Sequence, residues 1–455
     1  MSSSSSARSS SARSKQYEKP GRDSAPRSGA RSRDLAATRF PAQLDADENT
    51  MPGVTITRRG AERLRTGHPW VYRSEIVTIL PSDRSAGFAP VYEHNGDLLG
   101  TALFNADSEI VLRLLHESEM AEEAEVLALL KVRLSRAIAR RRELLGEDFE
   151  QNRHSAARLV FSEADALPGL IVDKYGELLM VQIASKALDT EVVRAAIVST
   201  LVDELSPATI LERPSPRIRE LEQLTAPPSA VLYSKGSPLT DSAFLLNGLG
   251  FRFDAEAGQK TGAFLDQREN YAAAARYAKG RALDICTYQG GFALHMAKVC
   301  PKVTGVDISR AALEVAEQNL VANRLALGES EVEWVEANAF DLLRDWSDAG
   351  TQFDTIVLDP PAFAKSKRAV DGALRGYKEM NLRALRMLAP GGRLITNSCS
   401  HQVSIDEFTE VVRAAAGDAR RRVRLLERRG ASADHPVVLN MPETEYLKCL
   451  ILEVE

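Results

Sequence analysis

Residues 282–292 read ALDICTYQGGF, a short apolar run that ends in a turn with two glycines. From this stretch onward the chain alternates between strand-like and helix-like patterns. The predicted strands are residues 281–285, 303–306, 332–335, 355–358 and 393–396, and the clearest helices between them are 311–323 and 376–388. Alternation of this kind predicts an α/β fold with a parallel, doubly wound sheet.

Three strand ends in this predicted sheet carry groups that suit a nucleoside. Asp284 and the Gly290-Gly291 turn belong to the first strand, Asp307 ends the second, and Asn338 follows the third. A glycine turn lets a ligand approach the backbone, and an acid after the second strand suits both ribose hydroxyls. The turn is not GxGxxG, which disfavours a dinucleotide. Although Asp307 alone could simply cap the next helix, the three ends together predict S-adenosylmethionine as the cofactor.

Two later strand ends carry reactive groups about forty residues apart. One strand runs into residues 359–361 (Asp-Pro-Pro), and the other into residues 398–400 (Ser-Cys-Ser). If these strands are neighbours in one parallel sheet, their ends lie roughly 5 Å apart at the edge where open α/β sheets bind ligands. A carboxyl group that can hold a base and a thiol that can attack it predict chemistry on a pyrimidine ring. For Cys399 alone, a small buried hydrophobic residue is the alternative.

Composition limits the other classes of protein. The formal charge is -5, from 58 basic and 63 acidic residues, so any RNA binding must use local basic patches. No run approaches eighteen apolar residues, so no membrane span or membrane partner is expected. Four widely spaced cysteines without a CxxC predict neither a disulfide framework nor a zinc site, and no metal is expected. Free thiols fit a reducing, cytoplasmic location.

The chain divides by pattern into four segments. Residues 1–50 are rich in Ser and Arg and predict a disordered tail, with a transit peptide as the alternative. Residues 51–117 contain short strands and an Asn95-Gly96 hairpin signal, which predict a small β-barrel. Residues 118–243 read as a central α/β domain that begins with a long helix, and residues 244–455 hold the doubly wound sheet.

Several motifs together carry a family resemblance. They are GQKTGAFLDQR (258–268), YQGGF (288–292), DPPAF (359–363), GYK (376–378), SCS (398–400) and ADHP (433–436). With these motifs the chain resembles the class I ribosomal RNA methyltransferases that make 5-methylcytidine in the large subunit, and GHPWVY (67–72) resembles their PUA segment. The resemblance covers roughly residues 54–455. It implies an N-terminal PUA barrel that binds RNA, a central α/β domain and a C-terminal Rossmann-like methyltransferase domain.

The resemblance also implies a set of site residues. Cys399 would be the nucleophile and Asp359 its partner, which holds the base. The residues expected near S-adenosylmethionine are Gln267, Arg268, Asp284, Thr287, Tyr288, Gly290, Gly291, Asp307, Ile308, Asn338, Ala339 and Asp359. The residues expected near the RNA are Pro360, Pro361, Phe363 and Lys365. Phe363 could stack on a flipped base or merely pack, and Lys365 could touch phosphate or lie in a solvated loop.

Three positions depart from the family pattern. Asn338 stands where an acid often meets the adenine amino group, and its amide oxygen is expected to accept that bond instead. Gln289 replaces a commoner threonine. Ala362 stands where many RNA enzymes of this chemistry have a second cysteine that aids product release. The other cysteines, 286, 300 and 449, are expected to be buried, and His401 and His435 to be structural.

Two other functions remain open at this point. The first is methylation of an exocyclic amine, because Asp-Pro-Pro resembles that signature; such enzymes, however, want an aromatic residue directly after the prolines and need no thiol. The second is a non-catalytic RNA-binding or ribosome-assembly factor that has kept the fold. The expected partner in the leading hypothesis is large-subunit ribosomal RNA. The oligomeric state stays open, with a homodimer as one option.

Overall fold

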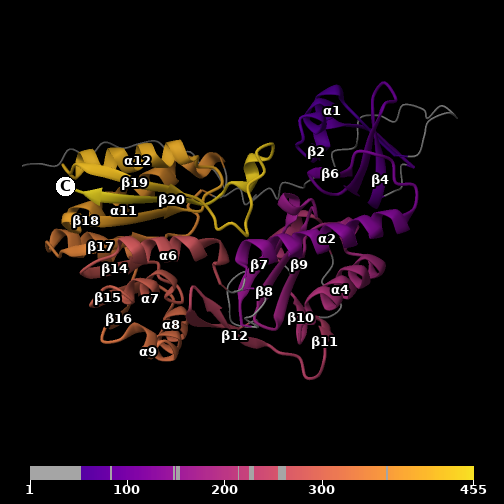
Figure 1. The fold of residues 1–455 in the computed structure, drawn as a ribbon. Helices are drawn as coiled ribbons and strands as arrows, with labels where there is room; N and C mark the ends of the chain where they lie inside the picture. The colour runs from indigo at the N-terminus through magenta and orange to yellow at the C-terminus, as the bar shows by residue number, and fades with distance from the viewer. Residues whose placement is uncertain are drawn as a thin grey trace, which may run out of the picture. The chain divides into compact units, whose positions relative to one another are not determined.

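A computed structural model describes residues 53–81, 85–146, 149, 154–213, 215–224, 230–254, 263–364 and 367–455. The predicted tail (residues 1–50) and the candidate Lys365 lie outside the described residues. The described part of the chain forms four sheets, of six, five, two and seven strands (Figure 1). Within it, no helix is long and apolar enough to cross a membrane.

The first sheet has six strands in the order β2-β6-β5-β4-β1-β3. Its strands are β1 (Gly53–Ile56), β2 (Trp70–Tyr72), β3 (Ile76–Leu80), β4 (Ala86–Glu93), β5 (Leu98–Asn105) and β6 (Ile110–His116). Strands β4 and β5 are antiparallel and join at the predicted Asn95-Gly96 turn, where the Gly96 N–H donates to the Glu93 carbonyl. Helix α1 (Arg58–Arg65), which was not predicted, begins at Thr57, whose hydroxyl accepts from the Gly60 N–H.

A five-stranded sheet with the order β11-β10-β9-β8-β7 forms the central domain. Its strands are β7 (Ala156–Phe161), β8 (Leu170–Tyr175), β9 (Leu178–Ile183), β10 (Thr209–Glu212) and β11 (Val231–Ser234). Its helices are α2 (Glu123–Leu145), α4 (Glu191–Leu205) and α5 (Pro216–Leu221). The long helix predicted at the start of this segment is confirmed as α2.

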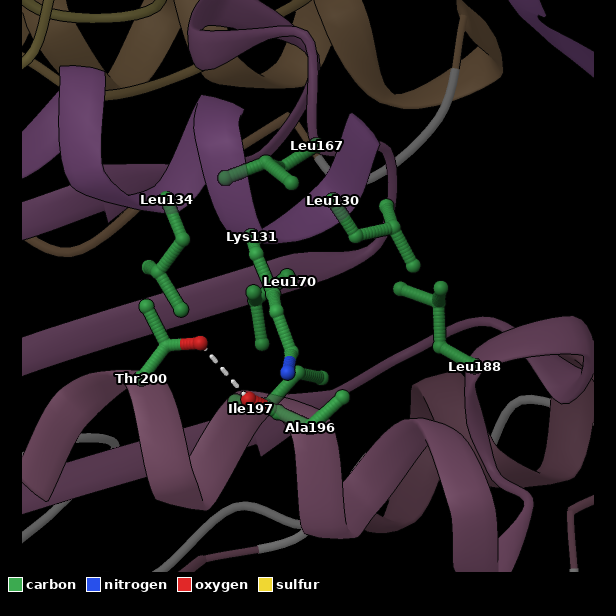
Figure 2. A pocket seen from close by; sticks show the side chains of 9 residues that line it. All are labelled: Leu130, Lys131, Leu134, Leu167, Leu170, Leu188, Ala196, Ile197 and Thr200. Carbon is green, nitrogen blue, oxygen red and sulfur yellow. Dashed lines mark hydrogen bonds between the residues drawn. The ribbon is translucent and has the colours of Figure 1, made fainter. Parts of the chain in front are cut away.

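Helices α2 and α4 pack through apolar side chains. In Figure 2, Leu130 and Leu134 of α2 lie opposite Ala196 and Ile197 of α4, and the Thr200 hydroxyl bonds back to the Ala196 carbonyl at 2.8 Å. The space that remains between them is only about 10 Å³. This volume is too small for a ligand, so the contact is part of the core of the central domain.

The C-terminal domain begins with a hairpin of β12 (Asp241–Leu246) and β13 (Leu249–Asp254). Its seven-stranded sheet has the order β16-β15-β14-β17-β18-β20-β19. The strands are β14 (Arg281–Ile285), β15 (Lys302–Asp307), β16 (Glu331–Glu336), β17 (Phe353–Leu358), β18 (Leu388–Ser398), β19 (Val423–Arg429) and β20 (Lys448–Val454). The helices are α6 (Arg268–Tyr277), α7 (Gly291–Ala297), α8 (Arg310–Ala322), α9 (Arg324–Leu327), α10 (Ala339–Asp348), α11 (Val370–Met387) and α12 (Ile405–Asp418).

Helices cover both faces of this sheet. Alternate residues of β14 show the division: Ala282 packs in a cluster with α6 and α7, whereas Leu283 packs with α10, α11 and α12. Strands β14 to β18 pair in parallel, while β20 lies antiparallel between β18 and β19. The five predicted parallel strands and the doubly wound fold are therefore confirmed, and β19 and β20 were not predicted.

Candidate active site

The two reactive strand ends lie side by side. Strands β17 and β18 are parallel neighbours, with Leu358 opposite Thr396, as the sequence predicts. The Cys399 Sγ atom lies 3.8 Å from the carbonyl oxygen of Pro360, in the loop that begins with Asp359. Both Cys399 and Asp359 are partly exposed. The arrangement therefore presents a thiol and a carboxylate together at one edge of the sheet.

A chain of amide hydrogen bonds positions the Asp359 carboxylate. The Gln267 side-chain nitrogen donates to Asp359 Oδ1 at 3.0 Å, and the Gln267 side-chain oxygen accepts from the Asn270 amide at 2.6 Å. Asn270 in turn accepts from Arg429 Nε at 2.9 Å. The guanidinium can only donate, so it fixes the direction of every bond in the chain. Asn270 and Arg429 were missed from sequence because they lie just outside the motifs at residues 258–268 and 433–436 and meet Gln267 only in the folded chain.

Hydroxyl groups join the two reactive loops beneath the thiol. The buried Tyr377 hydroxyl bonds to Ser398 Oγ at 3.0 Å and to Ser400 Oγ at 2.9 Å. Ser400 Oγ also accepts from the Ala364 N–H at 3.2 Å. Each of the two serines that flank Cys399 is thereby tied to α11, and one of them also to the loop after β17. This explains physically why a tyrosine of the GYK motif belongs to the site.

Asp284 is a buried acceptor that is only half satisfied. Its Oδ2 atom accepts from the Thr287 hydroxyl at 2.6 Å and from the Ala293 N–H at 2.9 Å. Its Oδ1 atom has no hydrogen-bond partner among the described residues, although the side chain is fully buried. Burial raises the pKa of Asp284 to about 7. An unpartnered buried carboxylate oxygen fits a cationic ligand group.

Asp307 is held at the end of β15 by backbone donors. Its two oxygens accept from the N–H groups of Tyr288 and Ser309, each at 2.9 Å. Tyr288 has a positive φ of 52°, which turns its N–H toward this carboxylate. Each oxygen keeps a further lone pair for a ligand hydroxyl. The adjacent Ile308 is 68% exposed and offers an apolar surface beside the carboxylate.

Asn338 occupies its predicted place but uses its oxygen differently. Oδ1 accepts from the N–H groups of Phe340 and Asp341, so the residue is the N-cap of α10. That this oxygen accepts from the adenine amino group stays a prediction, and in the structure the oxygen already accepts from two backbone donors. The exposed side-chain nitrogen remains as a donor toward a ring nitrogen. Ala339 is the first residue of α10.

The glycine turn has no room for side chains. Gly290 has a φ of 84°, and a Cβ atom there would lie 2.9 Å from the Trp334 ring. A Cβ atom on Gly291 would lie 2.6 Å from the Tyr271 ring. Such distances are well inside van der Waals contact, so both positions require glycine. The turn between β14 and α7 is therefore packed closely against Trp334 and Tyr271.

Two predicted site residues make contacts of another kind. The buried Arg268 guanidinium donates to Asp434 Oδ2 at 2.7 Å and to the Ala156 carbonyl at 2.8 Å, so it ties the start of α6 to the ADHP motif and to β7. The ring of Phe363 packs against those of Phe340 and Tyr377, with centroids 5.8 and 4.7 Å away. These contacts favour packing over base stacking for Phe363.

The remaining cysteines and two histidines differ in how far they are buried. Cys300 and Cys449 are buried, as predicted, but Cys286 is partly exposed because it follows the end of β14 with a φ of 65°. His435 is buried and bonds to Asp434 at 2.9 Å, which fits a structural role. His401 is exposed and stacks on Tyr446. In the described part of the chain, no group of three His, Cys, Asp or Glu side chains could hold a metal ion.

Comparison with known proteins gives consistent matches. Residues 166–442 match the family model of S-adenosylmethionine-dependent methyltransferases, and residues 54–117 match that of PUA-like domains. The chain is 37% identical over 400 residues to Ribosomal RNA large subunit methyltransferase I of Shewanella denitrificans, covering 87% of this chain and 98% of that protein. It is 34% identical over 406 residues to the protein of the same name in Klebsiella pneumoniae, covering 88% and 98%.

Solved structures share the fold. A methyltransferase crystallised in complex with SAH aligns with a TM-score of 0.73 at 19% identity, covering 89% of this chain and all of that chain. An S-adenosylmethionine-dependent methyltransferase from Streptococcus mutans aligns with a TM-score of 0.72 at 18% identity and the same coverage. At these identities the likeness shows the fold.

Proposed function

The chain belongs to the family of S-adenosylmethionine-dependent methyltransferases and carries a PUA-like domain, and from that premise we propose that it methylates C5 of a cytosine in large-subunit ribosomal RNA. The RNA substrate is suggested by relatives named Ribosomal RNA large subunit methyltransferase I, which the chain matches over almost their whole length. The single observation that carries the C5 chemistry is the Cys399 thiol, 3.8 Å from the Pro360 carbonyl and beside Asp359.

The chemistry explains why both groups are needed. Carbon 5 of cytosine is a poor nucleophile in the aromatic ring. The Cys399 thiolate adds to C6, and the electron pair of the C5–C6 double bond makes C5 nucleophilic. The Asp359 carboxyl group accepts from the exocyclic amine and, when protonated, donates to N3, which stabilises the charge that develops on the ring.

The product forms in two further steps. The cofactor, when bound, supplies an electrophilic methyl group. Carbon 5 forms a bond to this methyl carbon, and the carbon–sulfur bond of the donor breaks. A base then takes the C5 proton, the C5–C6 double bond re-forms, and Cys399 leaves as the thiolate. Ala362 offers no second thiol for this last step, so release must use another group. A base inside a helix must be flipped out before C6 can be reached.

We propose that the cofactor lies along the carboxyl ends of β14, β15 and β16. The orphaned oxygen of Asp284 would accept from the amino group of its methionine part, and the Gly290-Gly291 turn would pass close beside it. Asp307 would hold the ribose hydroxyls, Ile308 would cover the adenine, and Asn338 would donate to it. Thr287 would act through its hydroxyl bond to Asp284 and Tyr288 through its N–H bond to Asp307. Ala339 would act through its place at the start of α10, and Gln267 through its hydrogen bond to Asp359.

Mapping 5-methylcytidine in ribosomal RNA tests the proposed function directly. We expect one cytosine of the large-subunit RNA to lose its methyl group in cells that lack the protein and to regain it when the gene is restored. Purified protein with labelled S-adenosylmethionine should then transfer label to that RNA. Label on an exocyclic amine would favour the alternative chemistry, and RNA binding without any label transfer would favour a non-catalytic assembly factor.

The Asp307→Ala variant is expected to bind S-adenosylmethionine roughly 10²-fold more weakly. It loses charge-assisted hydrogen bonds to the ribose, which together contribute about 3 kcal/mol. Isothermal titration calorimetry with S-adenosylmethionine measures the change. The matched control is Glu314→Ala on the exposed face of α8, where the carboxylate pairs only with Arg310. Equal affinity of the Asp307→Ala variant and this control would remove Asp307 from the cofactor site.

The raised pKa of Asp284 predicts pH-dependent cofactor binding. The ordinary pKa is 3.8, whereas burial raises that of the folded protein to about 7. Between these values the folded protein keeps a proton that the unfolded chain has lost, so the contribution of Asp284 to stability falls as the pH rises from about 4 to 7. A cationic ligand group favours the ionised form. Cofactor affinity should therefore fall about tenfold for each pH unit below 7. In this range, binding should release the Asp284 proton to the buffer.

Calorimetric titration between pH 5.5 and 8 in two buffers of different ionisation enthalpy measures both effects. The Asp284→Asn variant should bind more weakly at pH 8 and show little dependence on pH. An unchanged pH dependence in this variant would assign the effect to another group.

A further inference from the structure

Lys448 is a buried lysine next to the proposed nucleophile. It is the first residue of β20, lies opposite Ser398 of β18 in the antiparallel pair, and is only 3% exposed. Its ammonium nitrogen donates to the carbonyl oxygens of Ser400 and Tyr446, at 2.7 and 2.8 Å. Among the described residues, no carboxylate lies within ion-pair distance of it. Burying an ammonium group without a counter-ion costs free energy of folding, so a functional role for this lysine is worth testing.

The hydrogen bond to Ser400 holds the turn that presents the thiol. Cys399 lies between Ser398 and Ser400, and the Lys448 ammonium group donates to the carbonyl oxygen of Ser400, the residue that follows Cys399. Tyr377 of α11 holds the side chains of Ser398 and Ser400 through its hydroxyl group. Lys448 is therefore the backbone support of the turn, and Tyr377 is its side-chain support.

Lys448 carries a positive charge among groups that are negative when ionised. Cys399, Glu445 and Glu407 favour the charged form of Lys448, against the burial that lowers its pKa to about 8. A negative charge on Cys399 acts to raise the pKa of Cys286, Tyr377 and Lys448, and for Lys448, a cation, this is an attraction. Asp359, on the neighbouring strand end, adds a negative charge near Cys286. A positive charge near a thiol favours the thiolate, which is the reactive form.

We propose that Lys448 is a positioning residue that holds the Cys399 turn and that its positive charge favours the thiolate form of this cysteine. The thiol proton leaves to water before RNA binds, so the nucleophile is ready when the base enters. The inference rests on the proposed role of Cys399 as nucleophile and extends it to the group that activates it. It also gives a reason for a buried charge in a strand that otherwise packs with apolar residues.

The test measures the reactivity of Cys399 without RNA or cofactor. The rate of alkylation by iodoacetamide is followed from pH 5.5 to 10, and peptide mass spectrometry separates Cys399 from the other three cysteines. In Lys448→Met the midpoint of the pH–rate curve should rise by about one unit, which is about tenfold slower alkylation at pH 7. Lys448→Arg, which keeps the charge, should restore most of the rate. Lys448→Gln, which keeps a donor but no charge, should behave like Lys448→Met.

A matched control is Lys302→Met on β15 of the same sheet, where the lysine pairs with Glu331 at the surface. It should leave the midpoint unchanged. If Lys448→Met does not fold, as judged by circular dichroism, the Arg and Gln variants still decide. Equal midpoints for Lys448→Arg, Lys448→Gln and the wild type would overturn the electrostatic role. Failure of the C5 mechanism would show elsewhere, as methyl transfer that survives loss of Cys399.

Discussion

Replacing Cys399 with alanine is expected to lower methyl transfer by roughly 10⁴-fold or more, the scale seen when a covalent nucleophile is removed. Without the thiolate, C6 cannot be attacked, and C5 stays an unreactive ring carbon. Single-turnover transfer of labelled methyl groups to unmodified large-subunit RNA measures the loss. Binding of S-adenosylmethionine should change little, because the proposed cofactor contacts come from β14, β15 and β16.

A matched control separates chemistry from packing. Cys300→Ala removes a thiol of the same size that is 2% exposed and lies in the core beside α7, so it should reduce stability slightly and leave the rate almost unchanged. RNA that carries 5-fluorocytidine at the target adds a second measurement. Fluorine at C5 cannot leave as a proton, so wild-type protein should form a stable adduct that the Cys399→Ala variant cannot form. Full activity in the alanine variant would exclude the C5 mechanism and favour an amine as the acceptor.

The Asp359→Asn variant is expected to lower the single-turnover rate by about 10²- to 10³-fold, similar to the loss of one stabilising group in an acyl-transfer site. The asparagine keeps one acceptor oxygen, which the Gln267 side chain, the donor to Asp359 Oδ1, and the exocyclic amine of the base would have to share. The amide also carries no negative charge and cannot give a proton to N3. The change keeps the shape of the side chain, so the lost rate reports hydrogen bonding and charge.

The control is Asp341→Asn on α10, which makes the same substitution at an exposed carboxylate that pairs with Arg344. Its rate should match the wild type. The 5-fluorocytidine adduct should still form in Asp359→Asn, but slowly, since the thiol remains. If the adduct forms at the normal rate while methyl transfer is lost, Asp359 acts after thiol addition and its role in holding the ring would need to be replaced.

The sequence predicted the sheet and its reactive edge because these depend on local patterns. Strands β14 to β18 each contain apolar residues and are followed by polar or glycine residues, and a parallel sheet brings all such ends to one edge. That logic placed Cys399 beside the loop of Asp359 correctly. It also found Asp284 and Asp307, whose types and positions follow from the turn after each strand.

The supporting residues could not be predicted in this way. Asn270 and Arg429 reach Asp359 only through Gln267, and they come from segments about 160 residues apart. Lys448 looks like an ordinary charged residue in sequence, and its burial follows from β20, an antiparallel strand that the alternating pattern did not include. Asn338 shows a further limit of reasoning from sequence. Its side-chain oxygen was expected to bind a ligand, whereas in the structure it accepts hydrogen bonds from the first turn of α10.

The place of β20 between β18 and β19 has a consequence for how the protein acquires its structure. Until residues 448–454 insert, β18 is an open edge with unpaired backbone groups, and the turn with the thiol lacks its lysine support. Strand β18 can pair with β20 only after about fifty intervening residues have been synthesised. Pairing between strands so far apart in sequence is slow. The turn that carries Cys399 is therefore synthesised well before the strand that supports it. A nascent chain holds the thiol before it can assemble the surroundings of that thiol.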